Sequence, residues 1–499
     1  MRIWLSGLIL MICGASAGAQ EARLEYALDV WDWTSPCRDL AKFSTWTEDF
    51  KEIGGTRMEI SAPWNVLEPE EGKYDLSFVA DRLKIARGAG LGLRVRINSF
   101  FYATPAWLKA EHWRGAKGEV PEATPNPVSI CDERFVVAYG KLCRELAKRF
   151  AGEDVYWSPF IGVHAELKWS DWWSFDPATM RAWEKAIVPG AARARWLSDV
   201  VGDEAALPRV PAVPLPTAGR EADASAQSRA LIAFREHAWR ETLAKFDAAI
   251  REEDPRAKTS APLGESYRSA SARMSNLDYA GMSRAGSGFD QVVHSYDFFW
   301  HAPGSGTWES AGARSATWQA GASVAAFVGM TRRPVIFEFD TETMLTQLGY
   351  SQEKLAAIAD AVLDAGAAGV KVANASGSEA LPSTYRMLRM LGEKVRARKV
   401  ARVVKEEPGK TTLLFVSKWA TYCHRDENEW LHELQFGTWK KLVDAGEPVR
   451  FVCEDNLDEE LAGYRKLVVV HAPAALMPRS ARERLEALKK KVKEVVEVR

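Results

Sequence analysis

The sequence lacks an excess of charge of either sign. Its 499 residues include 66 Lys and Arg and 67 Asp and Glu, which gives a formal net charge of −1. Proteins that bind nucleic acid or anionic membranes usually carry a basic excess or a clustered basic surface. The one basic cluster, at residues 489–493, lies among apolar residues and is typical of a solvated helix face. We therefore expect no nucleic-acid partner.

Long apolar segments are absent after the first twenty residues. No later run approaches the roughly 20 apolar residues that a membrane-spanning helix needs, so we expect no membrane span. At the N-terminus, Arg2 precedes an apolar stretch at residues 3–12 and small residues at 14–19. This is the pattern of a secretory signal peptide, with cleavage expected after Ala17 or Ala19. The mature chain is expected to be secreted or periplasmic.

Cysteine is scarce, with six residues in the chain. Cys13 raises the alternative of a lipoprotein signal, but the bulky Ile12 before it disfavours that processing. The other five match no zinc-binding spacing, and they are Cys37, Cys131, Cys143, Cys423 and Cys453. The sequence also contains no G-x-G-x-x-G turn in its C-terminal part and no P-loop. We expect neither a metal nor a cofactor.

Eight short β-rich segments alternate with amphipathic helical stretches through the first 375 residues. The predicted strands are residues 26–30, 56–60, 92–97, 157–165, 258–262, 291–295, 334–339 and 369–373. Eight such units are typical of a (β/α)8 TIM barrel with loop insertions. The main insertion follows the fourth strand, and its proline-rich centre at 207–228 predicts a surface loop before a helix at 230–251.

The pattern restarts near residue 400. Strands are predicted at 411–416, 449–452 and 467–470, and helices at 429–445 and 480–495. These predict a smaller, parallel, flavodoxin-like α/β domain. We therefore divide the chain into a signal peptide (1–19), a barrel (20–398) and an α/β domain (399–499).

Two predicted strands deliver carboxylates to the barrel end where such folds place their catalytic groups. Glu166 follows the fourth strand beside Trp169, and nearby indoles would raise its pKa toward the range of a general acid. A structural salt bridge is the competing interpretation for Glu166. On the seventh strand, Glu338, Asp340 and Glu342 alternate and so share one face.

A carboxyl group at the end of each of these strands is the arrangement that glycoside hydrolysis requires. One acid protonates the leaving oxygen and the other attacks the anomeric carbon, with the two roughly 5–5.5 Å apart in retaining enzymes. On the sixth strand, His294 and Tyr296 are candidates to bind sugar hydroxyls and the nucleophile, respectively. Metal-dependent hydrolysis through Asp340 and Glu342 is a rival hypothesis.

Tryptophan is abundant: 20 residues equal the number of Phe and suggest surfaces that stack against ring-shaped ligands. The candidate sugar platforms are Trp64, Trp107, Trp169, Trp172, Trp173 and Trp300. For each of them, packing in the core or at the rim is an equally good interpretation.

Several segments carry a family resemblance. Residues 56–60 and 64–75, the latter reading WNVLEPEEGKYD, look like the second βα unit of clan A glycoside hydrolases. Residues 103–108 resemble a signature of family 42, the β-galactosidases. Residues 446–452 and 464–470 are similar to the α/β domain that contributes to trimer formation in that family.

This resemblance implies a retaining β-glycosidase that acts on an oligo- or polysaccharide, and a homotrimer or other homo-oligomer. By position, Glu166 corresponds to the acid/base and Glu338 to the nucleophile, with Asp340 and Glu342 as rivals. Arg57 corresponds to an arginine that supports the nucleophile.

The chain departs from the clan pattern directly before the acid/base. The clan places Asn there, where its amide contacts the sugar 2-hydroxyl, whereas this chain has Ala165. Either His164 or Asn98 supplies the contact, or the substrate is unusual, or catalysis has been lost. The last case defines the second hypothesis, a carbohydrate-binding pseudoenzyme. The small β domain that usually completes family 42 is not found, which favours a neighbouring family of the clan.

Overall fold

Eight parallel strands close into a barrel. The computed structural model describes residues 24–30, 38–99, 103–114, 118, 128–160, 174–211, 224–263, 289–295, 317–340, 344–345, 349–373, 382–398, 407–424, 430–457 and 459–499. In order around the barrel the strands are β1 (Glu25–Val30), β2 (Arg57–Pro63), β3 (Gly92–Asn98), β4 (Val155–Phe160), β5 (Lys258–Leu263), β6 (Gln291–Ser295), β7 (Val335–Asp340) and β8 (Gly369–Ala373), and β8 pairs with β1. The predicted TIM barrel is confirmed, because each strand begins within two residues of its expected position.

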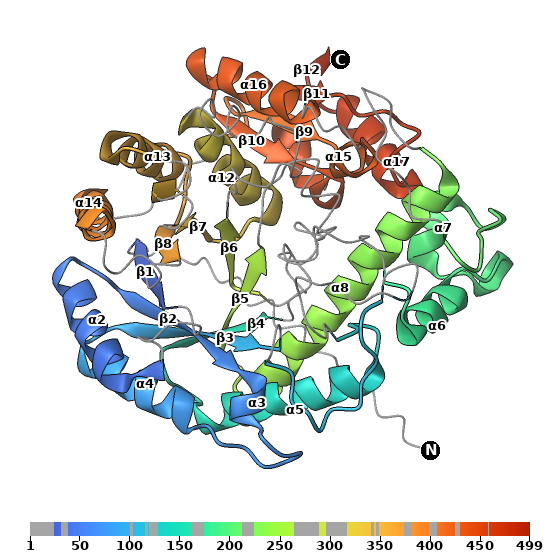
Figure 1. Cartoon of the computed structure of the whole chain (residues 1–499). Helices are drawn as coiled ribbons and strands as arrows, with labels where there is room; N and C mark the ends of the chain where they lie inside the picture. The colour runs from blue at the N-terminus through green and yellow to red at the C-terminus, as the bar shows by residue number, and fades with distance from the viewer. Residues whose placement is uncertain are drawn as a thin grey trace, which may run out of the picture.

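Helices surround the strands (Figure 1). They are α2 (Leu40–Glu52), α3 (Trp64–Leu67), α4 (Ser77–Gly88), α5 (Glu133–Arg149), α6 (Pro177–Ala186), α7 (Arg195–Val201), α8 (Ala226–Glu253), α12 (Thr317–Thr331), α13 (Gln352–Asp364) and α14 (Pro382–Arg398). The insertion after β4 contains α6 and α7, which the sequence analysis did not identify. Both helices contribute apolar side chains to a second core that includes the first half of α8.

A second parallel sheet forms the C-terminal domain. Its strands are β9 (Thr412–Val416), β10 (Val449–Val452), β11 (Lys466–Val470) and β12 (Glu494–Val498), in the order β10-β9-β11-β12. Its helices are α15 (Lys418–Cys423), α16 (Trp430–Asp444) and α17 (Arg479–Lys489). This order is the start of a flavodoxin-like sheet, as expected. The predicted helix at 480–495 is wrong in its last part, because the chain leaves α17 at Lys489 and pairs with β11 as β12.

The C-terminal domain packs against two barrel helices (Figure 1). The side-chain amide of Asn456 donates hydrogen bonds to the carbonyls of Gly329 and Met330 on α12, at 3.0 and 3.3 Å. Lys418 of α15 forms ion pairs with Glu236 on α8 (3.3 Å) and with Asp455 (2.6 Å). The two domains are therefore joined by buried polar contacts as well as by apolar packing.

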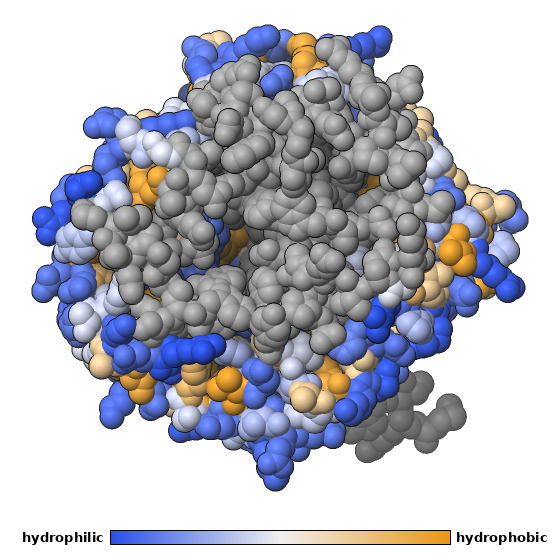
Figure 2. All heavy atoms as spheres, in the orientation of Figure 1, coloured by the Kyte–Doolittle hydropathy of each residue, from blue (hydrophilic) through white to orange (hydrophobic). Residues whose placement is uncertain are grey.

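The described surface is mostly hydrophilic on the face shown in Figure 2, where hydrophobic side chains occur in small separate groups. None of the helices in the described ranges combines the length and the apolar character that crossing a membrane requires.

The contact between α12 and β10 leaves no room for a side chain at Gly329. A Cβ atom there would lie 2.6 Å from the carbonyl oxygen of Phe451 and 2.9 Å from its amide nitrogen. We expect Gly329→Ala to lower the free energy of unfolding by about 1–3 kcal/mol, because two backbones must separate. Thermal unfolding measures the change. The matched control is Gly437→Ala on α16, where a Cβ meets nothing within 4 Å, and equal effects of the two changes would contradict the prediction.

Candidate active site

Near the N-terminal ends of the strands, the barrel interior is filled by charged side chains rather than by apolar ones. Arg94 of β3 contacts Glu25 of β1 (2.5 Å), Glu59 of β2 (2.9 Å) and Gln291 of β6 (2.5 Å). Because β3 and β6 are not neighbours in the barrel, the contact to Gln291 crosses its interior. Burial would raise the pKa of Glu25, but the charges of Arg94 and Arg57 outweigh it and hold this pKa below its ordinary value.

A second group of charges lies nearer the C-terminal ends of the strands. Lys371, in the middle of β8, contacts Glu338 of β7, Glu59 (2.9 Å) and Asp29 of β1 (3.5 Å). Arg96 of β3 contacts the same Asp29 and lies 2.6 Å from Glu59. The side chains of Asp29, Glu59 and Lys371 are at most 2% exposed, whereas Glu338 is 17% exposed. Glu338 is thus the most exposed member of this group.

Four of the predicted site residues lie toward the same end of the barrel. Glu338 and Asp340 are the fourth and sixth residues of β7, so both side chains lie on one face of the strand and are half-buried. Asn98 is the last residue of β3, is fully buried, and donates a hydrogen bond from its amide to the Ser61 hydroxyl at 3.0 Å. Trp107, in the segment after β3, is half-buried and donates from its indole nitrogen to the Glu68 carbonyl.

Other predicted site residues lie outside the described part of the chain. They are His164, Glu166, Trp169, Tyr296 and Trp300, together with the alternative nucleophile Glu342 and the platform candidates Trp172 and Trp173.

The role expected for Arg57 is wrong. Arg57 is the first residue of β2, at the end of the barrel opposite to the ends that carry Asn98 and Asp340. Its guanidinium contacts Glu25 at 3.3 Å, Asp154 at 3.3 Å and the Leu93 carbonyl at 3.0 Å. The strand continues for six residues beyond Arg57. The Arg57 side chain therefore lies near the N-terminal ends of the strands, too far from Glu338 to support it.

Trp64 is not a sugar platform. It is fully buried and packs against Phe135 and Tyr139 of α5. Its indole nitrogen donates to the Glu68 carboxylate at 2.8 Å, and the backbone amide of Gly72 donates to the same carboxylate at 2.9 Å. The segment that carries the clearest family resemblance therefore anchors the chain after β2, and no sugar can reach Trp64.

His294 points out of the barrel instead of into its mouth. It stacks on Phe327 of α12, and its Nε2 lies 3.1 Å from the Ser323 hydroxyl. Burial lowers the pKa of His294 to about 3, although the negative charge of Glu338 acts in the opposite direction. The side chain is neutral at ordinary pH and joins β6 to α12, so the expected contact with sugar hydroxyls is wrong.

The sequence analysis missed four residues of the charged group: Asp29, Glu59, Arg96 and Lys371. A signal was present in the strand patterns. Charged or polar residues alternate with apolar ones in the segment GLRVRIN at β3, and a single lysine interrupts the apolar segment GVKVA at β8. Alternation of this kind indicates a polar barrel interior.

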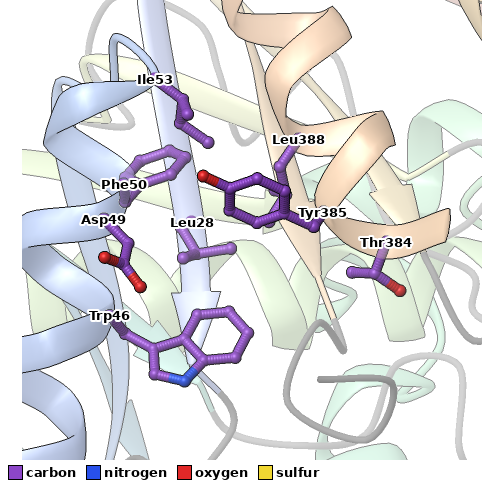
Figure 3. A pocket seen from close by; sticks show the side chains of 8 residues that line it. All are labelled: Leu28, Trp46, Asp49, Phe50, Ile53, Thr384, Tyr385 and Leu388. Atoms are coloured by element: carbon purple, nitrogen blue, oxygen red, sulfur yellow. The ribbon is translucent and has the colours of Figure 1, made fainter. Parts of the chain in front are cut away.

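A cavity of about 300 Å³ lies outside the barrel wall (Figure 3). Leu28 of β1 forms its floor, Trp46 of α2 borders one side, and Tyr385 and Leu388 of α14 border the other. Because neighbouring residues of a strand face opposite sides, Leu28 faces this cavity while Asp29 faces the barrel interior. The cavity is therefore separated from Glu338 by β1.

Among the described residues, no group of three His, Cys, Asp or Glu side chains is placed to hold a metal ion.

No known protein-family model matches the sequence, and no curated protein does. The fold is similar to that of a β-galactosidase from Halorubrum lacusprofundi, which is 13% identical, with 95% of this chain and 73% of that chain aligned at a TM-score of 0.67. A family 42 β-galactosidase from G. stearothermophilus is 11% identical over 96% of this chain and 72% of that one, with a TM-score of 0.68. The catalytic domain of a β-amylase from Paenibacillus polymyxa is 11% identical over 76% and 99% of the two chains, with a TM-score of 0.56. The expected resemblance to family 42 is confirmed at the level of the fold.

The buried position of His294 predicts a pH dependence of stability. Its pKa is about 3 in the folded chain, against an ordinary value of 6.5. As the pH falls from about 6.5 toward 3, the unfolded chain takes up a proton at this residue that the folded chain does not, so the free energy of unfolding decreases. We expect this decrease to be smaller in His294→Gln, as measured by urea unfolding at several pH values. Ser323→Ala, which keeps the imidazole, should retain the full dependence, and an unchanged dependence in His294→Gln would contradict the prediction.

Proposed function

We propose that the protein is a retaining glycoside hydrolase that cleaves β-linked sugars, with Glu338 as nucleophile and Glu166 as acid/base. The observation that carries this proposal is the position of Glu338: a partly exposed carboxylate, held by a buried lysine, toward the end of a TIM barrel where such folds place their catalytic groups. The fold shared with β-galactosidases supports the proposed substrate class.

In the proposed mechanism, the Glu338 carboxylate attacks the anomeric carbon while Glu166 protonates the departing glycosidic oxygen. The sugar is then bonded to a Glu338 oxygen. Glu166, now deprotonated, removes a proton from water as the water attacks the same carbon and releases Glu338. Two displacements at one carbon leave the anomeric configuration unchanged.

Glu338 is our candidate for the nucleophile because the buried Lys371 contacts its carboxylate. Its contact with Lys371 favours the charged carboxylate, the form a nucleophile needs. Asp340 ends the strand two residues further on, and its shorter side chain suits it to bind a sugar hydroxyl. Asn98, at the corresponding end of β3, is fully buried with its amide bonded to Ser61, so His164 is our candidate for the 2-hydroxyl contact that Ala165 cannot make.

The carboxylate pair is tested by Glu166→Gln and Glu338→Gln. Each change keeps the size of the side chain but removes the acid, so kcat should fall by roughly 10³-fold or more in both. The assay is hydrolysis of a panel of aryl β-glycosides and polysaccharides by the purified mature chain, with the product anomer assigned by NMR. Asp340→Asn serves as the comparison and should lose affinity more than kcat.

Three outcomes would change this assignment. Full activity of Glu338→Gln together with an inactive Asp340→Asn would move the nucleophile to Asp340. An inverted product would remove the covalent intermediate. Sugar binding without turnover by the unmodified protein would support the pseudoenzyme, the alternative that Ala165 suggests.

We also propose that the chain is exported, on the basis of Arg2, the apolar residues 3–12 and the small residues that follow. Expression with the native N-terminus in a bacterial host should give a periplasmic or extracellular protein that begins at Gly18 or Gln20. N-terminal sequencing of the exported protein checks this expectation. Replacing Leu8 with Arg in the apolar stretch should retain the chain in the cytoplasm, whereas an uncleaved product from the native sequence would refute the proposal.

A further inference from the structure

Carboxylates from three strands converge on one ammonium group. Lys371 is 2% exposed, and its Nζ atom lies 2.9 Å from Glu59, 3.5 Å from Asp29 and in contact with Glu338. A buried lysine is costly to keep charged unless acids surround it. Here the acids come from β1, β2 and β7, so the position of Lys371 on β8 is held from several sides.

Asp29 and Glu59 contact arginine side chains of β3 as well as Lys371. Asp29 and Glu59 both contact Arg96, and Glu59 also contacts Arg94 at 2.9 Å. Loss of Lys371 would therefore leave each of these two acids a strong cationic partner. Glu338, whose side chain is partly exposed, contacts Lys371 directly. The charge of Lys371 therefore acts directly on Glu338, the most exposed of the three acids.

We propose that Lys371 is the positioning residue for Glu338: it keeps the carboxylate ionised and directs it toward the sugar, the task that the family resemblance assigned to Arg57. The inference rests on the proposed function of Glu338. It extends that function by naming the charge on which the nucleophile depends, and by identifying Glu59 as the acid that competes for this charge.

The electrostatic surroundings of Glu338 come from every strand that packs near it in the described chain. The charged or titratable groups involved are Asp29 on β1, Glu59 on β2, Arg94 and Arg96 on β3, His294 on β6, Asp340 on β7 and Lys371 on β8. Burial lowers the pKa of His294 to about 3, so this side chain is neutral near neutral pH. Among these described groups, the lysine, the two arginines and the neighbouring acids are the ones that carry charge near neutral pH.

The first experiment is the pH dependence of kcat/KM in Lys371→Met. The acid limb of this profile reports protonation of the nucleophile in the free enzyme. An opposite charge in contact favours the ionised acid by about 1–3 pH units, so its removal should move the acid limb upward by that amount. A fall in kcat is expected at every pH, because the carboxylate also loses its orientation.

The second experiment is the same profile in Glu59→Gln. This change removes a negative charge and leaves Lys371 shared between Asp29 and Glu338, so the acid limb should move downward, by about one unit. Two substitutions in one buried group that shift the limb in opposite directions cannot both be explained by loosened packing. If Lys371→Met does not fold, the direction of the shift in Glu59→Gln decides the question.

The matched control is Lys418→Met in the C-terminal domain. Lys418 is also a buried lysine between two acids, Glu236 and Asp455, but it lies outside the barrel interior. Its loss should lower stability and leave the pH profile unchanged. An acid limb that stays in place in Lys371→Met, or moves upward in Glu59→Gln, would overturn the inference. Absence of turnover in the unmodified protein, or full turnover in Glu338→Gln, would instead refute the proposed function.

Discussion

The charged interior of the barrel is the constraint on which the rest of the structure depends. Glu59 stands at its centre, because this one carboxylate contacts Arg94, Arg96 and Lys371. Through these partners it links the lower group, which includes Glu25, to the upper group, which includes Glu338. Charges taken out of water destabilise a fold unless each one is paired. Pairing of these opposite charges therefore favours the register in which the barrel closes.

The strands were predictable because local pattern and final position agree. All eight barrel segments are short and β-rich, and helices lie between most of them in the described chain, so their order follows from the alternation itself. The C-terminal end of the chain was harder, because β12 is an exposed edge strand that follows α17 after only four residues, three of them lysines. Its strand conformation comes from pairing with β11, a contact that no local pattern of the helix reveals.

The site was less predictable than the fold. Alternation along a strand shows which residues share a face, but it shows neither how far along the barrel axis they lie nor whether that face points into the barrel. Alternation correctly placed Glu338 and Asp340 on one face of β7. It did not show that Arg57 begins its strand and so belongs to the opposite end of the barrel. Nor did it show that His294 faces α12. Alternate residues of a strand share a face, but which face points into the barrel is known only when the neighbouring strands are placed. Residue type alone was also misleading for Trp64, whose indole satisfies a buried carboxylate.

The C-terminal domain has a physical link to the site even though it packs outside the barrel. Asn456 binds the carbonyls at the C-terminal end of α12. The same helix holds β6 through the contact between Ser323 and His294. The next residue of that strand, Ser295, pairs with Glu338 on β7. The helix behind β6 is therefore fixed at one end by the second domain and along its length by the barrel. A brace of this kind suits a site in which one carboxylate must keep a precise position against a buried ammonium group.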